Sequence, residues 1–147
     1  MVHSACPPAI RPRDYTLGEL GAFHAHIGPF LVLGYRIGRY VRDHFCDDPF
    51  SISARVCCPA RSPERCMVDG IQVSSGCTLG KENIVVIDDP DVRAEFEAGG
   101  RLIVIRPRPF PRPVRDAHYR ENLLRCAEDF FVLPDAELFD VSRYGRG

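Results

Sequence analysis

The sequence predicts an α+β protein in which N-terminal helices pack on a mostly antiparallel sheet and a C-terminal helix follows. Apolar residues at helical spacing dominate the first third of the chain, short Ile- and Val-rich segments crowd its middle, and a second helical pattern closes it. With 147 residues, 45% of them hydrophobic, the chain suits one globular unit. We expect a surface segment over residues 1–15, a core domain over 16–106, and an arm and helix over 107–147 that pack on the core.

Two helices are expected at the start of the core. Residues 16–19, Thr-Leu-Gly-Glu, have the form of a capping box, which predicts a helix from there to about His24. Gly28-Pro29 breaks the chain, and Pro29 is well placed to open a second helix. In that helix Gly34 and Gly38 offer a groove where another backbone can approach closely. Its buried face is predicted from the three- and four-residue spacing of Phe30, Leu33, Ile37, Tyr40, Val41, His44 and Phe45.

The middle of the chain is predicted to form strands around a third helix. That helix is expected over residues 63–74, with Met67, Val68 and Ile71 facing inward. A glycine-bracketed loop follows it at residues 76–80, and a Gly99-Gly100 turn is expected to join the last two strands. The predicted strands cover residues 51–57, 83–88, 92–96 and 101–106.

The last forty residues divide into an arm and a helix. Residues 106–113 alternate proline with mostly basic residues and predict an extended polyproline arm. An amphipathic helix is expected over residues 117–131. The arm has two interpretations: it docks in an acidic or aromatic groove of a partner, or it straps the last helix onto the sheet.

Composition and charge argue against nucleic-acid binding, membrane insertion and secretion. A net charge of −1 gives no excess of cations for nucleic acid or an anionic membrane, so neither is expected as a partner. Aliphatic runs reach only about four residues, as in Ile84 to Ile87, too short for a spanning helix. Residues 1–15 lack the apolar core of a signal peptide, and the seven cysteines are an odd number without a Cys-x-x-Cys pair. We therefore expect a cytoplasmic protein with reduced thiols.

The first candidate site is the histidine pair His24 and His26. Residues two apart on a regular helix point in very different directions, whereas in an extended stretch they point the same way. The break at Gly28-Pro29 would thus let both imidazoles converge on one metal ion. The alternative is that one histidine lies on the surface and the other is a hydrogen-bonded core residue.

The second candidate site follows on the third helix and its loop. Cys66 and Asp69 are three residues apart and share a helix face. Cys77 lies between glycines, where its sulfur would be a good thiolate near a metal ion or near Lys81, the single lysine of the chain. The alternative for each cysteine is a small buried side chain. The loop is not a phosphate loop, because Glu82 stands where Ser or Thr would bind magnesium.

These two segments resemble a known family. The segment His24-Ala-His-Ile-Gly-Pro-Phe-Leu-Val-Leu-Gly-Tyr-Arg-Ile-Gly38 is similar to the pattern His-Gly-His-x-Cys-Pro-Gly-x-x-x-Gly-x-Arg. The segment Cys66-Met-Val-Asp-Gly-Ile-Gln-Val-Ser-Ser-Gly-Cys-Thr-Leu-Gly-Lys-Glu-Asn83 is similar to Cys-x-x-Asp-Ala-Ile-Gln-x-x-Thr-Gly-Cys-Thr-x-Gly-Lys-Gly-Asn. Both patterns belong to the E-subunit family of formylmethanofuran dehydrogenase, and the resemblance covers roughly residues 16–106.

The resemblance implies a small α+β core with a metal-associated cleft. We do not expect the family's separate C-terminal zinc finger within these residues, since only Cys126 follows Arg106. It also departs from the pattern at Gly28, where the family has cysteine. The remaining donors suit tetrahedral zinc, or another divalent metal, and Asp69 and Gln72 would orient them. The expected ligands are His24, His26, Cys66 and Cys77.

Three functions remain open. The first is a metal-binding accessory protein of formylmethanofuran dehydrogenase, in which molybdopterin and iron–sulfur clusters belong to other subunits and not to this chain. The second is an enzyme in its own right, with Cys77 as nucleophile, a histidine as base, and Lys81 stabilising negative charge. The third is an interaction module that uses the Pro/Arg arm. A homodimer is expected from the glycine groove and an exposed sheet edge.

Overall fold

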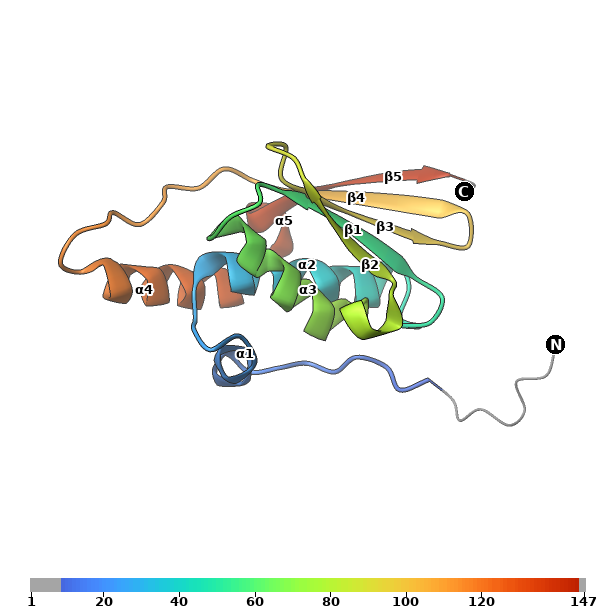
Figure 1. Cartoon of the computed structure of the whole chain (residues 1–147), viewed down its shortest axis with the longest axis horizontal. Helices are drawn as coiled ribbons and strands as arrows, with labels where there is room; N and C mark the ends of the chain where they lie inside the picture. Colours follow the sequence, from blue (N-terminus) through green and yellow to red (C-terminus); the bar gives the residue numbers. More distant parts are fainter. Residues whose placement is uncertain (1–8, 146–147) are drawn as a thin grey trace.

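The computed structural model describes residues 9–145 and confirms the α+β class (Figure 1). Residues 1–8 of the predicted surface segment lie outside the described residues. Over the described range, seven helical segments and five strands follow one another along the chain. They are α1 (Leu17–His24), α2 (Pro29–His44), β1 (Ser53–Cys58), η1 (Glu64–Cys66), α3 (Met67–Ser75), η2 (Leu79–Lys81), β2 (Ile84–Asp88), β3 (Arg93–Ala98), β4 (Arg101–Pro107), α4 (Tyr119–Val132), α5 (Asp135–Leu138) and β5 (Phe139–Gly145).

The five strands form one sheet in the order β2-β1-β3-β4-β5. The pair β1 and β2 is parallel, because α3 crosses from the end of one strand to the start of the other. The other three pairs are antiparallel, and Gly99 and Gly100 take positive φ in the turn between β3 and β4, as predicted. The mostly antiparallel sheet is therefore confirmed, with one parallel edge strand added.

Helices α2 and α3 lie along one face of the sheet and bury the main core between the layers (Figure 1). Their backbones touch because glycines line the crossing. A Cβ on Gly34 would meet the Met67 backbone, and one on Gly38 would meet Ser74. The predicted glycine groove is thus filled by α3 of the same chain, so it offers no surface to a second copy.

The N-terminal helices begin where the sequence predicts. The Thr16 hydroxyl accepts a hydrogen bond from the Glu19 backbone N–H at 3.1 Å, and the Glu19 carboxylate accepts one from the Thr16 N–H at 2.8 Å. This completes the capping box. Helix α2 begins at Pro29, and its residues 29–38 are all buried.

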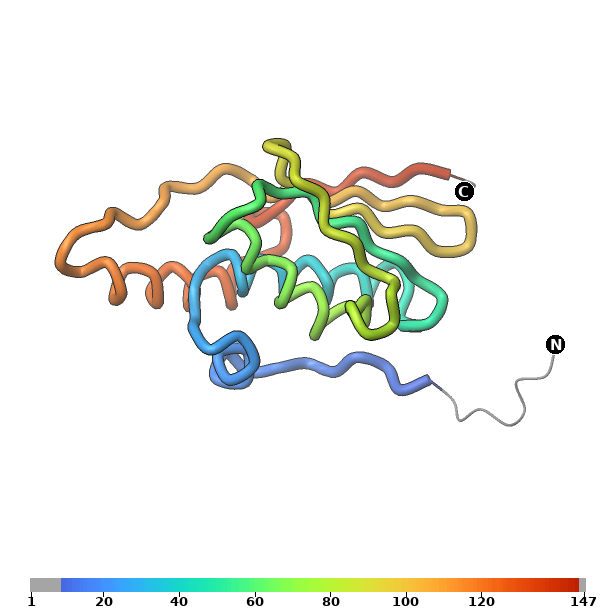
Figure 2. Tube along the Cα trace, viewed as in Figure 1, coloured from blue at the N-terminus to red at the C-terminus, as the bar shows by residue number. Residues whose placement is uncertain are grey.

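The segment before α1 is held on the helices, on the side away from the sheet (Figure 2). The Tyr15 N–H donates to the Tyr35 hydroxyl at 3.0 Å. The Arg42 guanidinium reaches the Asp14 carboxylate at 2.7 Å. These two contacts hold Asp14 and Tyr15 on α2, and residues 9–13 line the cavity described below.

The Pro/Arg arm straps α4 onto the core. Phe110 packs against Phe30 and Phe130, with ring centroids 5.6 and 4.8 Å apart, and the Arg112 guanidinium lies 4.7 Å from the Phe30 ring centroid. The Arg108 N–H donates to the Leu138 carbonyl at 2.8 Å. Of the two interpretations of the arm, these contacts favour the strap.

The C-terminal segment also contains a short helix and an edge strand that the sequence did not predict. Strand β5 pairs with β4 along its whole length. Its residues alternate only weakly between apolar and polar, because an edge strand with an exposed outer side needs few apolar residues. Within residues 9–145, no helix has the length and apolar character needed to span a bilayer.

Candidate functional site

A hydrogen-bonded chain links the end of α1 to α3. His24, the last residue of α1, contacts the Asp69 carboxylate through Nδ1 at 2.7 Å. The other Asp69 oxygen accepts from the Gln72 amide at 3.2 Å. The Gln72 carbonyl oxygen in turn accepts from the Leu79 backbone N–H at 3.0 Å. Asp69, held in turn by Gln72, therefore fixes the His24 ring, and within residues 9–145 the Nε2 of His24 has no hydrogen-bond partner.

His26 lies beside His24 through a turn that differs from the predicted extended stretch. The two ring centroids are 5.6 Å apart. The reason is Ala25, the C-cap of α1, whose φ of 74° is left-handed and reverses the chain direction. A zinc ion 2.0–2.1 Å from a ring nitrogen lies about 3.2 Å from the ring centroid, so two imidazoles on one tetrahedral ion have centroids about 5.2 Å apart. The observed separation permits a shared ion.

Ala25 carries backbone strain that glycine would relieve. Ala25 and Glu82, both at positive φ, stand where the two family patterns have glycine. Ala25→Gly should raise the free energy of unfolding by about 0.5–1 kcal/mol, since the left-handed cost of a Cβ disappears. The check is urea unfolding beside Ala22→Gly, an exposed position inside α1, which should lose about 1 kcal/mol. If Ala25→Gly lowers the free energy of unfolding as much as Ala22→Gly does, Ala25 is not strained.

Cys66 lies near this network but is not prepared as a ligand. It precedes α3 and is half-buried. Burial raises the pKa of its thiol, and the nearby Asp69 carboxylate raises it further. At neutral pH the thiol is therefore protonated, and a metal ion would have to displace that proton.

Cys77 occupies a different environment from the one that the glycine loop suggests. Its side chain is fully buried in the main core, and its backbone N–H donates to the Ser75 hydroxyl at 3.1 Å. Burial raises the pKa of the thiol to about 11, although Ser75 and the charge of Lys81 act in the opposite direction. A neutral, buried thiol is neither a ready nucleophile nor an open ligand.

The loop after Cys77 is held by Asn83. The Asn83 side-chain oxygen accepts from the Thr78 N–H at 2.8 Å, and its amide donates to the carbonyls of Pro49 and Ile52 at 2.9 and 3.0 Å. The Lys81 ammonium donates to the Thr78 hydroxyl at 2.7 Å. The loop thus presents Lys81 from a fixed backbone.

The structure brings only part of the predicted ligand set together. His24, His26, Asp69 and Gln72 form one cluster, whereas Cys77 is in the core. Over residues 9–145, no three His, Cys, Asp or Glu side chains gather in a geometry that holds a metal ion. Of the predicted zinc ligands, His24 and His26 lie close enough to share a metal ion. Cys66 and Cys77 do not join them in a cluster of three or more ligands.

Gly28, where the family pattern has cysteine, lies beside His26. A Cβ built on Gly28 would lie 3.5 Å from Nε2 of His26. The side chain of a cysteine there would therefore start beside the His26 ring. In this chain the position supplies no side chain, and the pair is left with two imidazoles.

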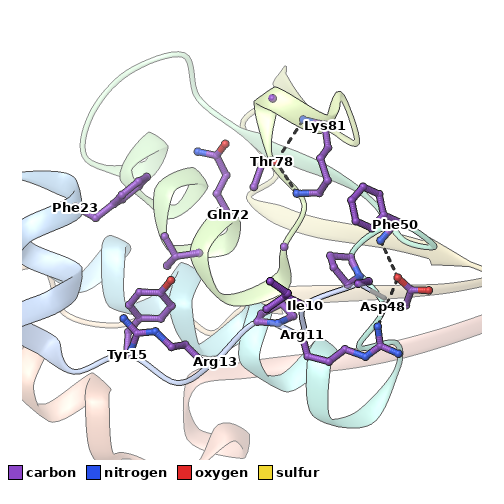
Figure 3. Close-up of a pocket in the computed structure, with 16 residues that line it drawn as sticks. Ile10, Arg11, Arg13, Tyr15, Phe23, Asp48, Phe50, Gln72, Thr78 and Lys81 are labelled. Atoms are coloured by element: carbon purple, nitrogen blue, oxygen red, sulfur yellow. Dashed lines mark hydrogen bonds and ion pairs between the residues drawn. The ribbon is translucent and has the colours of Figure 1, made fainter. Parts of the chain in front are cut away.

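A cavity of about 1530 Å³ lies next to the cluster (Figure 3). The N-terminal segment, the end of α1, the 48–50 loop, α3 and the glycine loop surround it. Gln72 belongs to both places, since it lines the cavity and binds Asp69. The sequence did not predict this cavity, because the apolar residues that shape it, such as Phe23 and Phe50, are exposed and follow no periodic pattern. Lys81 was singled out in the sequence for a role beside Cys77, and in the structure it lines this cavity.

Fold and cluster together define a small α+β core protein with an imidazole–carboxylate site at the junction of two helices. The chain belongs to the family described as FmdE, molybdenum formylmethanofuran dehydrogenase operon, whose model matches residues 23–140. This confirms the resemblance found in the sequence.

One curated relative matches part of the chain. It is a probable S-adenosyl-L-methionine-binding protein of Archaeoglobus fulgidus, 31% identical over 68 residues. The match covers 45% of this chain and 19% of that protein, so the chain spans about a fifth of the relative's length.

Proposed function

We propose that the chain is a cytoplasmic accessory protein of formylmethanofuran dehydrogenase that binds a divalent metal, zinc in the first instance, through His24 and His26. The observation that carries the proposal is the 2.7 Å contact between Nδ1 of His24 and Asp69. A carboxylate on one ring nitrogen fixes the tautomer and the ring orientation, as is common for metal-binding histidines. Family membership supports the link to the dehydrogenase and to its other subunits as partners.

The proposal uses two ligands from this chain instead of the four first expected. Two imidazoles leave positions on a tetrahedral ion for water or for donors from outside the chain. A bound zinc ion would supply Lewis-acid chemistry or be delivered to another protein. Cys77 is left out both as ligand and as nucleophile, because its thiol is buried and its pKa is raised to about 11.

A homodimer would use the sheet edge. Strand β2 is an edge strand with exposed Val85, Val86 and Ile87, and it carries neither proline nor lysine to block pairing. This observation supports the dimer as part of the proposal. The glycine groove does not support it, since α3 occupies that groove.

The metal proposal is tested by zinc competition against a colorimetric chelator in reducing buffer. The wild type should bind zinc, and His24→Ala or His26→Ala should weaken binding by about 100-fold or more, since each removes a ligand. Asp69→Asn should weaken it by about 10–100-fold, the usual effect of losing the group that orients a ligand. Gly28→Cys should tighten binding, because it adds a thiolate beside His26.

His118→Ala is the matched control, since this histidine is exposed in a distant part of the chain and should leave the affinity unchanged. The proposal fails if the wild type binds no zinc, or if the double variant His24→Ala/His26→Ala binds it as the wild type does.

A further inference from the structure

The cavity beside α3 has an apolar wall that faces solvent. Ile10, Phe23 and Phe50 line it with 90%, 56% and 74% of their surface exposed. Single exposed apolar residues are ordinary, but three large ones around one hollow are typical of a binding surface. Figure 3 shows them arranged around the hollow, on segments far apart in the sequence. The cavity therefore favours a ligand with an apolar body.

Three basic residues line the same cavity, and two of them pair with carboxylates. Arg11 pairs with Asp47 at 3.4 Å, and Arg13 pairs with Glu19 at 3.2 Å. Lys81 has no carboxylate within 4.0 Å among the residues that the structure describes. Lys81 is therefore the cation whose charge remains to be matched.

The Lys81 ammonium is held ready for a partner. It donates one hydrogen bond to Thr78 at 2.7 Å and lies 5.9 Å from the Phe50 ring centroid. An ammonium carries three donors, so two remain for a ligand. Because Asn83 anchors the loop, little conformational entropy is lost when an anion binds.

We propose that this cavity binds an organic anion with an aromatic or aliphatic body, whose carboxylate, sulfonate or phosphate pairs with Lys81 while Phe50, Phe23 and Ile10 cover the body. The inference does not rest on metal binding, since none of these residues is a proposed metal ligand. Gln72 connects the two sites, because it lines the cavity and binds Asp69.

The test compares two fluorescent probes on the full chain in buffer with EDTA. The anionic probe is 1-anilinonaphthalene-8-sulfonate, and the neutral one is N-phenyl-1-naphthylamine, which has the same rings without the sulfonate. Lys81→Met should weaken binding of the anionic probe by about tenfold, the value of a charge-assisted hydrogen bond. It should change the affinity for the neutral probe by no more than about twofold. Phe50→Ala should weaken the binding of both probes.

Two control variants test whether the effects are specific to the cavity. Arg55→Gln removes an exposed cation on β1, outside the cavity, and Val132→Ala removes an exposed apolar side chain on α4. Neither should change either affinity. The proposal is overturned if the wild type binds neither probe, if Lys81→Met weakens both probes equally, or if Arg55→Gln acts like Lys81→Met.

Competition then identifies the anionic group. Displacement of the anionic probe by phenylbutyrate more than by phenyl phosphate indicates a carboxylate, and the reverse indicates a phosphate. Displacement by inorganic phosphate as effective as that by phenyl phosphate would overturn the requirement for an apolar body. Because EDTA is present throughout, failure here leaves the zinc proposal standing, and failure of zinc binding leaves this one standing.

Discussion

Gly34→Ala is expected to lower the free energy of unfolding by about 3 kcal/mol, at the upper end of the usual cost of overpacking. The added Cβ would lie 2.8 Å from the Met67 carbonyl carbon and 2.9 Å from its Cα. Both contacts are with backbone, which cannot rotate away, so α2 and α3 would have to separate. Urea unfolding followed by circular dichroism measures the loss.

Gly18→Ala is the matched control for this variant. Gly18 is an exposed residue of α1, and a Cβ there meets only the Thr16 hydroxyl oxygen at 4.0 Å. Because alanine is the better helix former, the change should raise stability by about 0.5–1 kcal/mol. If Gly34→Ala is as stable as Gly18→Ala, the close approach of α2 and α3 is contradicted.

Arg36→Ala is expected to cost about 3 kcal/mol, through a lost hydrogen-bond donor and a new cavity. Arg36 is 3% exposed on α2, and its guanidinium donates to the Phe130 carbonyl at 2.7 Å and to the Asp135 carboxylate at 2.9 Å. Truncation leaves the carbonyl at the end of α4 without its donor and opens a cavity between α2 and α4. This one side chain therefore ties the C-terminal helices to the core.

Two variants separate these effects for Arg36. Asp135→Asn should cost only about 1 kcal/mol or less, because Asp135 is partly exposed and its charge is screened by solvent. Arg125→Ala, an exposed arginine on α4, should change stability by less than about 0.5 kcal/mol. Losses as small for Arg36→Ala as for Arg125→Ala would contradict the role of Arg36 as the link between helices.

Most of the fold follows from local patterns. The capping box at Thr16, Pro29 at the start of α2 and the Gly99-Gly100 turn each act through neighbouring residues, so the sequence shows them directly. Strand β5 escaped prediction because an exposed edge needs little apolar alternation. The parallel pairing of β1 and β2 depends on which way α3 crosses, a tertiary property.

The candidate site was predictable only in part. Asp69 and Gln72 were expected to orient ligands, and in the structure Asp69 contacts His24 while Gln72 donates to Asp69. Residue spacing does not show which side chains of a loop point into the core. Cys77 was therefore expected at the site, whereas its side chain is buried. The left-handed Ala25 was hidden because alanine seldom takes that conformation.

The most direct test of the central claim is anomalous diffraction at the zinc edge from reduced crystals grown with zinc. We expect a peak 2.0–2.1 Å from a ring nitrogen of both His24 and His26. Asp69 should still contact Nδ1 of His24 in that structure. A peak that contacts neither imidazole, or a zinc ion bound through Cys77 instead, would contradict the account.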